Sequence, residues 1–226
     1  IDVEALSDVW ILKNLTDADL SQWIGPIREL SSHFARIEIC EPYENDILIF
    51  PVGNRTLRDM NGWAAALAGF CAKHEIPIKI TRCPLLQNTA NVKYAYEINH
   101  TYLADAIRIF PLRPFFTISE IEFAKECREI AGAGKANVRW YTSLLDPFLD
   151  GRDGPEILRT LETYLLDENS SIVDTASRLF VHKNTVKYRL QKAGDILGFR
   201  IGDVPQSKNL IYALSLQRIL HTSETG

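Results

Sequence analysis

A stretch of eleven residues near the carboxyl end of the chain supplies the side chains that proteins use to bind DNA. Lysine and arginine pair with phosphates, an asparagine amide can hydrogen-bond an adenine edge, and a threonine methyl can touch a thymine methyl. The candidate contacts to double-stranded DNA are His182, Lys183, Asn184, Thr185, Lys187, Tyr188, Arg189 and Lys192. These groups can act together only if the surrounding elements present them on one exposed surface.

Two short helices joined by a tight turn are predicted around these residues. Ser171 is a good N-cap for the first helix, and Asp174 suits the helix dipole and can return a hydrogen bond to the cap. The apolar residues of this helix recur at helical spacing and are Ile172, Ala176 and Leu179. Because Ala176 is small, the two helices can cross closely, and Val181 ends the turn as an apolar plug. This is the layout of a helix-turn-helix, whose second helix enters the major groove.

The second helix is expected from about residue 183 to about residue 197, with one buried and one solvent-facing side. Its apolar stripe consists of Val186, Leu190, Ala193 and Leu197. The other residues of this helix are expected to point outward. Residues 178–200 contain six Lys or Arg and one acid, whereas the whole chain has a formal charge of −4. A compact basic segment on an acidic chain favours phosphate binding over the alternative of a plain solvated helix.

Four segments of the C-terminal part resemble, in order and spacing, the C-terminal domain of PucR-type bacterial regulators, which include purine-catabolism and sugar-diacid regulators. They are a TL..YL helix within 155–165, an A..LF.H.NT..YRL run at 176–190, a Leu-Gly step within 196–198 and an ALSL helix within 210–216. The resemblance covers about residues 142–221 and implies a DNA-binding transcriptional regulator. This family carries Phe and His where other helix-turn-helix units often have Gly and Ser, here Phe180 and His182. His182 either caps the second helix or touches a phosphate, and a capping or packing role is favoured.

The first 130 residues predict a small α/β domain. Strands are expected at 34–40, 47–50, 77–81 and 115–118, and helices at 16–30, 57–74, 92–109 and 119–130, with Thr16 and Ser119 as caps. In PucR-type regulators this position holds a degenerate relative of the GGDEF domain of diguanylate cyclases, which residues 92–111 and 115–117 resemble. By that resemblance the domain dimerises or relays a signal. The expected fold class is α+β: a GGDEF-like domain over 1–130, a connecting segment over 131–153 with a short helix at 140–149, and an all-α helix-turn-helix domain over 154–226.

Catalysis is not expected from this chain. A cyclase needs a Gly-Gly-acid turn, but the chain has no Gly-Gly pair, and the corresponding turn is Glu-Pro-Tyr-Glu-Asn-Asp at 41–46, where a solvated turn is favoured over a cation site. The five histidines are isolated and no nucleotide, zinc-protease or serine-hydrolase motif occurs, so no catalytic residue, metal or cofactor is predicted. The aromatic residues that could line an effector pocket are more simply core residues: Trp63, Tyr94, Tyr96, Tyr102 and Trp140. The alternatives are a cyclase-like nucleotide-converting enzyme with an appended helical interaction module, and a helical protein-interaction module without DNA affinity.

Composition is that of an ordinary globular protein, with 46% apolar and 24% charged residues, and no apolar run approaches the roughly 18–20 residues of a membrane span. The cysteines lack metal-ligand spacing and no signal peptide is recognised, so a reducing, cytoplasmic location is expected. Because the sequence begins with Ile, we expect further residues before it. A helix-turn-helix of this size commonly acts in two copies on two half-sites, so a homodimer is expected, and a small-molecule effector remains an open question.

Overall fold

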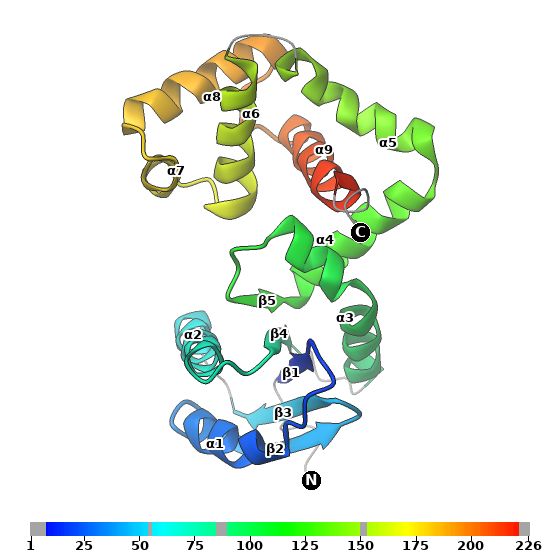
Figure 1. Ribbon diagram of the computed structural model, residues 1–226, viewed down its shortest axis with the longest axis vertical. Helices are drawn as coiled ribbons and strands as arrows, with labels where there is room; N and C mark the ends of the chain where they lie inside the picture. Colours follow the sequence, from blue (N-terminus) through cyan, green and yellow to red (C-terminus); the bar gives the residue numbers. More distant parts are fainter. Residues whose placement is uncertain (1–7, 54–55, 85–89, 150–152, 222–226) are drawn as a thin grey trace. The chain divides into compact units, whose positions relative to one another are not determined.

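The computed structural model describes residues 8–53, 56–84, 90–149 and 153–221, which form two compact units (Figure 1). Unit 1 comprises the described residues up to Leu103 together with Arg113–Glu122, and unit 2 comprises Ala104–Leu112 and the described residues from Phe123 onward. Two helices therefore contribute residues to both units. The predicted domain boundaries at residues 130 and 153 stay a prediction.

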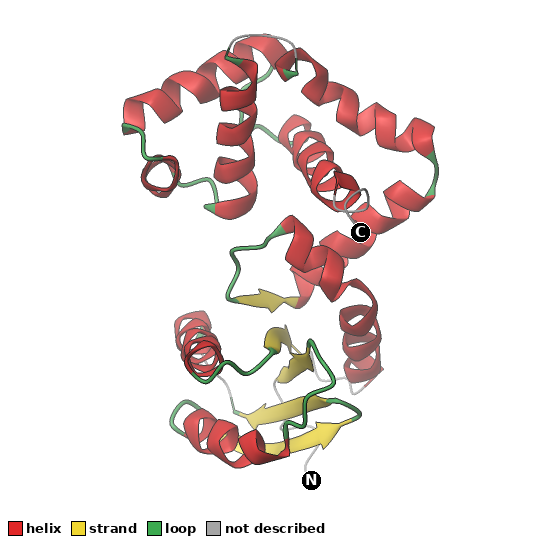
Figure 2. Ribbon diagram, in the orientation of Figure 1, coloured by secondary structure: helices red, strands yellow, loops and turns green. Residues whose placement is uncertain are grey.

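Unit 1 is built on a five-stranded sheet with the order β2-β3-β1-β4-β5. Its strands and helices, in chain order, are β1 (Asp8–Asn14), α1 (Ser21–Ser32), β2 (Arg36–Tyr43), β3 (Asp46–Val52), α2 (Leu57–Lys73), β4 (Ile78–Pro84), α3 (Ala90–Ile109), β5 (Phe115–Thr117) and α4 (Ile118–Gly132). All neighbouring strands are antiparallel except β4 and β5, which are parallel. The predicted α+β class is confirmed (Figure 2).

The central strand β1 is buried on both faces, which places the core of unit 1 on either side of it. Trp10 belongs to the apolar cluster that α1 and α2 cover, and its ring centroid lies 4.0 Å from that of Trp63 in α2. Val9 and Ile11 belong to a second cluster on the opposite face, together with Ala95 of α3. Figure 1 shows the same arrangement, with α1 and α2 on one side of the sheet and α3 on the other.

Several predicted boundaries of unit 1 are wrong. Strand β1 was not predicted. Helix α1 begins at Ser21, and the Thr16 hydroxyl accepts the N–H of Ala18 in a local turn and caps no helix. Ser119 does not cap α4 either. Thr117 precedes that helix, and its N–H and hydroxyl both donate to the Glu120 carboxylate, at 2.7 and 3.1 Å.

Unit 2 is all helical apart from its connections. Its remaining elements are α5 (Lys135–Thr142), the 3-10 helix η2 (Ser143–Phe148), α6 (Gly154–Glu162), the π-helical turn η3 (Thr163–Asp167), α7 (Ile172–Leu179), α8 (Lys183–Leu197) and α9 (Gln206–His221). The short helix predicted at 140–149 is instead the end of α5 followed by η2. Gly154 is required where α6 meets η2, because a Cβ there would lie 2.3 Å from the Phe148 carbonyl oxygen.

The core of unit 2 forms where α6, η3 and η2 meet α9. The fully buried side chains include Phe148, Leu161, Leu166 and Leu214. The Arg218 guanidinium of α9 binds both carboxylate oxygens of Asp167 at 2.8 and 2.9 Å, which fixes α9 against the π-helical turn. Among the described residues, no helix is long and apolar enough to span a bilayer.

Candidate nucleic-acid interface

Helix α7 begins with the predicted cap. The Ser171 hydroxyl accepts the N–H of Asp174 at 3.3 Å, and the extended backbone of Ser171 is typical of an N-cap. The Asp174 carboxylate does not return a hydrogen bond to the cap, because the N–H of Ser171 donates to the Glu168 carbonyl at 2.8 Å. The start of α7 is thus tied to the end of the preceding helical turn.

The turn between α7 and α8 reverses the chain through a left-handed residue. Phe180 has φ 56° and ψ 41°, and its N–H donates to the carbonyls of Ala176 and Ser177. The N–H of Val181 also donates to Ala176, at 3.0 Å. Ala176, the small residue predicted where the two helices cross, is 6% exposed, whereas the side chain of Phe180 is 95% exposed.

Helix α8 has the predicted bounds and the predicted buried face. His182 precedes it with an extended backbone, and Nδ1 of its ring accepts the N–H of Asn184 at 3.2 Å. Of the two roles considered for His182, the structure therefore shows the cap. Val186 and Ala193 are fully buried, and Leu190 and Leu197 are half-buried. Gly198, with φ 77°, ends the helix in the left-handed conformation.

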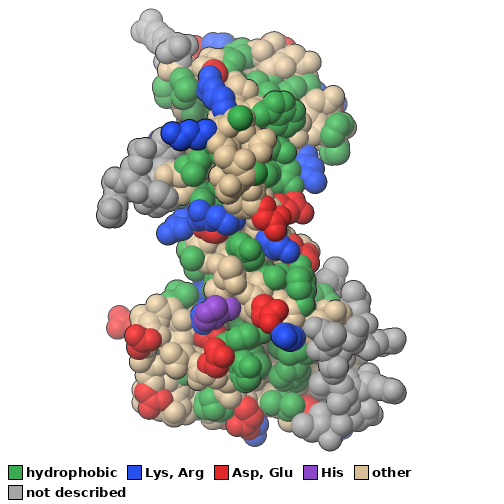
Figure 3. Space-filling model, turned by 90° about the vertical axis from the view of Figure 1, so that its right-hand side faces the viewer, with side chains coloured by type: hydrophobic (Ala, Val, Ile, Leu, Met, Phe, Trp, Pro, Cys, Tyr) green, Lys and Arg blue, Asp and Glu red, His purple; other side chains and the backbone are tan. Residues whose placement is uncertain are grey.

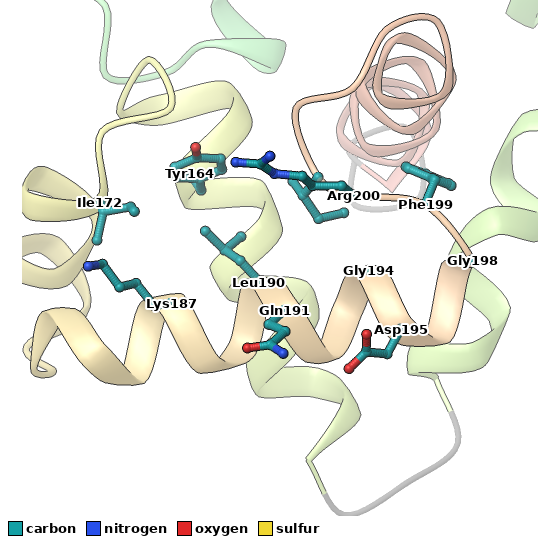
Figure 4. A pocket seen from close by; sticks show the side chains of 11 residues that line it. Tyr164, Ile172, Lys187, Leu190, Gln191, Gly194, Asp195, Gly198, Phe199 and Arg200 are labelled. Carbon is teal, nitrogen blue, oxygen red and sulfur yellow. The ribbon is translucent and has the colours of Figure 1, made fainter.

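The exposed face of α8 carries amide, basic and phenolic groups. Its exposed residues include Lys183, Asn184, Lys187, Tyr188 and Gln191. Gln191 was not among the predicted contacts, although its position four residues after Lys187 places the two on one face. Figure 4 shows Lys187 and Gln191 projecting from the same helix. Within the described residues, neither Lys183 nor Lys187 forms an ion pair, so their charges are free for another partner.

Arg189 does not lie on that face, and the expectation that every other residue of the helix points outward is wrong for it. Its side chain is 17% exposed, because its guanidinium binds the Glu156 carboxylate of α6 and donates to the Thr160 hydroxyl at 3.4 Å. Arg189 therefore fixes α8 against α6.

Two further predicted contacts lie at the edge of the exposed face. The Lys192 ammonium pairs with Asp153 at 2.8 Å and lies 5.9 Å from the ring centroid of Tyr188. The hydrogen bond to Asp153 raises the pKa of Lys192 above its usual value. Thr185 is half-buried, and its backbone N–H donates to the His182 carbonyl at 2.8 Å. Both side chains can reach a partner only along one side of the helix.

Charge is distributed unevenly over one face of the molecule. On the face shown in Figure 3, Lys and Arg side chains are spread over unit 2, and several Asp and Glu side chains lie over unit 1. The described residues contain no group of three or more His, Cys, Asp or Glu side chains placed to hold a metal ion. The chemistry that α8 offers is hydrogen bonding and pairing with anions.

Comparison with known proteins gives a family match for part of unit 2. Residues 157–216 match the family described as the PucR C-terminal helix-turn-helix domain. Over 83 aligned residues the chain is 36% identical to the purine catabolism regulatory protein of Bacillus subtilis. This alignment covers 36% of this chain and 15% of that protein. Over 71 aligned residues it is 39% identical to an uncharacterised protein of Mycobacterium tuberculosis. This second alignment covers 31% of this chain and 16% of that protein. This chain thus aligns with about one sixth of the length of these relatives.

One solved structure that aligns with this chain is the regulator of polyketide synthase expression from Bifidobacterium adolescentis. The alignment covers 94% of this chain and 81% of that protein, at 17% sequence identity and a TM-score of 0.35. The sequence matches carry the assignment. Residues 157–216 of this chain thus match a PucR-type helix-turn-helix domain.

Proposed function

We propose that this protein is a bacterial transcriptional regulator that binds double-stranded operator DNA through α8. The observation that carries the proposal is the exposed face of a capped helix whose opposite side, at Val186 and Ala193, is fully buried. Two lysines without ion pairs within the described residues, two amides and one phenol occupy that face. Such groups bind phosphates and base edges in the major groove.

The residues of this surface and its supports divide into four roles. Asn184 and Gln191 read base edges, because a side-chain amide can form two hydrogen bonds with adenine. Lys183 and Lys187 bind phosphates, with Tyr188 beside them, and Thr185 and Lys192 extend the surface at its edge. His182 and Arg189 act by positioning, the first as the cap of α8 and the second as its link to α6.

The remaining parts of the proposal concern assembly. The α/β domain predicted over residues 1–130 is a degenerate relative of the GGDEF domain that dimerises or relays a signal and catalyses no reaction. Two copies dock on half-sites separated by about one helical turn of DNA, roughly 34 Å, or a multiple of it. The four cysteines are unpaired and buried, in keeping with action in the reducing cytoplasm.

Selection of bound duplexes from a random pool, followed by titrations at several salt concentrations, tests this function. Asn184→Ala and Gln191→Ala should each reduce discrimination between selected and scrambled duplexes by about 1–3 kcal/mol. Lys187→Ala should weaken binding to every duplex and reduce the salt slope by about 0.9. The matched control is Lys73→Ala on α2 of unit 1, an exposed lysine for which no change is expected. The proposal fails if no duplex is enriched, or if both amide variants keep full discrimination.

A further inference from the structure

A cavity of about 600 Å³ lies in unit 2 beside α8. Its walls come from η3, the start of α7, α8 and the segment that follows α8, and its apolar lining is Tyr164, Ile172, Leu190, Phe199 and Ile201. All five side chains are half-buried, so each keeps apolar surface that unit 2 leaves uncovered. The volume falls in the range of roughly 300–1,000 Å³ that small-molecule sites occupy.

One wall of the cavity depends on a close approach of two backbone segments. The N–H groups of Gly198 and Phe199 both donate to the carbonyl of Gly194, at 2.8 and 3.2 Å. A Cβ at position 194 would lie 2.9 Å from the Phe199 carbonyl oxygen, so a larger residue there would displace this segment. The segment after α8, which supplies Phe199 to the cavity wall, is therefore packed directly against the end of α8.

Two cationic groups stand at the rim. Figure 4 shows the Arg200 guanidinium directed toward Tyr164, and Lys187 on the other side of Leu190. Within the described residues neither cation forms an ion pair and the Tyr164 hydroxyl has no hydrogen-bond partner. The acid that lines the cavity, Asp195, lies eight residues after Lys187, about 12 Å along the helix.

We propose that this cavity binds an amphipathic aromatic anion. The apolar body of the ligand lies on Leu190, Ile172 and Tyr164, and its anionic group lies at the rim, where Lys187 and Arg200 supply positive charge and Asp195 is distant. Apolar walls with a few charged or polar groups are typical of sites that fix both the position and the orientation of a small ligand. Because Lys187 is also a phosphate contact, an occupied cavity competes with DNA. This last step rests on the proposed function.

The test uses the full chain and two fluorescent probes of similar shape, the anionic 1-anilinonaphthalene-8-sulfonate and the neutral N-phenyl-1-naphthylamine. Wild-type protein should bind the sulfonate, and K187Q/R200Q should weaken that binding by roughly fivefold to tenfold, as expected for two exposed charge contacts. The affinity for the neutral probe should change less than twofold. The matched control R159Q removes an exposed arginine of α6 that does not line the cavity, and it should leave both affinities unchanged.

Absence of sulfonate binding overturns the proposal, and so does an unchanged sulfonate affinity in K187Q/R200Q or an equal loss for both probes. At a sulfonate concentration nine times its Kd, the affinity of the wild type for a selected duplex should fall about tenfold. An unchanged DNA affinity overturns the competition. If the wild type binds no duplex at all, the proposed function has failed, and the two fluorescence titrations still decide whether the cavity takes an aromatic anion.

Discussion

Replacing Phe180 by glycine should stabilise the helix-turn-helix. Phe180 has a left-handed backbone, with φ 56° and ψ 41°. An L-residue with a Cβ is less stable in that conformation than in the right-handed one by about 1–2 kcal/mol, whereas glycine adopts both readily. Because the ring is 95% exposed, its removal loses almost no buried apolar surface.

The magnitude follows from two opposing effects. Glycine relieves the backbone cost of about 1–2 kcal/mol, but it also raises the conformational entropy of the unfolded chain, which costs about 0.4–1 kcal/mol. The net gain in the free energy of unfolding should be about 0.5–1 kcal/mol. Phe180→Ala keeps the Cβ and therefore the backbone cost, so its stability should lie within about 0.5 kcal/mol of the wild type.

Native-state amide exchange followed by mass spectrometry measures this change in the full chain. Peptides that cover α7 and α8 should exchange about twofold to fivefold more slowly in F180G than in the wild type. Ser177→Gly is the control of opposite sign, because Ser177 is exposed on α7, where glycine lowers helix stability by a few tenths of a kcal/mol. Exchange in F180G that is as fast as in F180A, or faster, would refute the reasoning about the left-handed turn.

Three further predictions concern buried groups and a cap. Asp46→Ala should destabilise unit 1 by about 3–5 kcal/mol in urea unfolding followed by tryptophan fluorescence, because the Asp46 carboxylate is buried and pairs with Lys13 at 3.1 Å; an unchanged midpoint would contradict this. Ser171→Ala should speed amide exchange in α7 by about fivefold, from a loss of about 1 kcal/mol, and Ser171→Asp should restore protection; equal exchange in all three proteins would show that the cap contributes nothing. Burial raises the pKa of Cys127 to about 12 from 9.0, so the folded chain holds its thiol proton more tightly than the unfolded chain, and the free energy of unfolding should fall as pH rises from about 9 toward 12. Cys127→Ala should reduce that fall between urea titrations at pH 8 and pH 10.5, and parallel pH dependences would argue against a buried thiol.

The helix-turn-helix could be predicted from the sequence because its signals are local. A cap contacts the backbone two or three residues away, and an apolar stripe repeats within one helix, so both leave a pattern in consecutive residues. The structure accordingly has α8 at Lys183–Leu197, the Ser171 cap and the buried positions Val186 and Ala193. The same reasoning suggested both roles for His182, and only the ring orientation decided for the cap.

Features that depend on distant segments could not be read from the sequence. Strand β1 shows no alternation of apolar and polar residues, because α1 and α2 cover one of its faces and α3 covers the other. Its two neighbours in the sheet, β3 and β4, also come from later segments of the chain. Arg189 turns away from the exposed face because Glu156 and Thr160, on another helix, accept its hydrogen bonds.

The cavity beside α8 arises in the same way, since Tyr164, Leu190 and Arg200 meet only after three segments have packed. The sequence by itself determined which residues form the two helices, because helix formation and capping are decided within a few residues. Tertiary packing decided which of their side chains are free to bind, because a side chain's partners can lie anywhere in the chain.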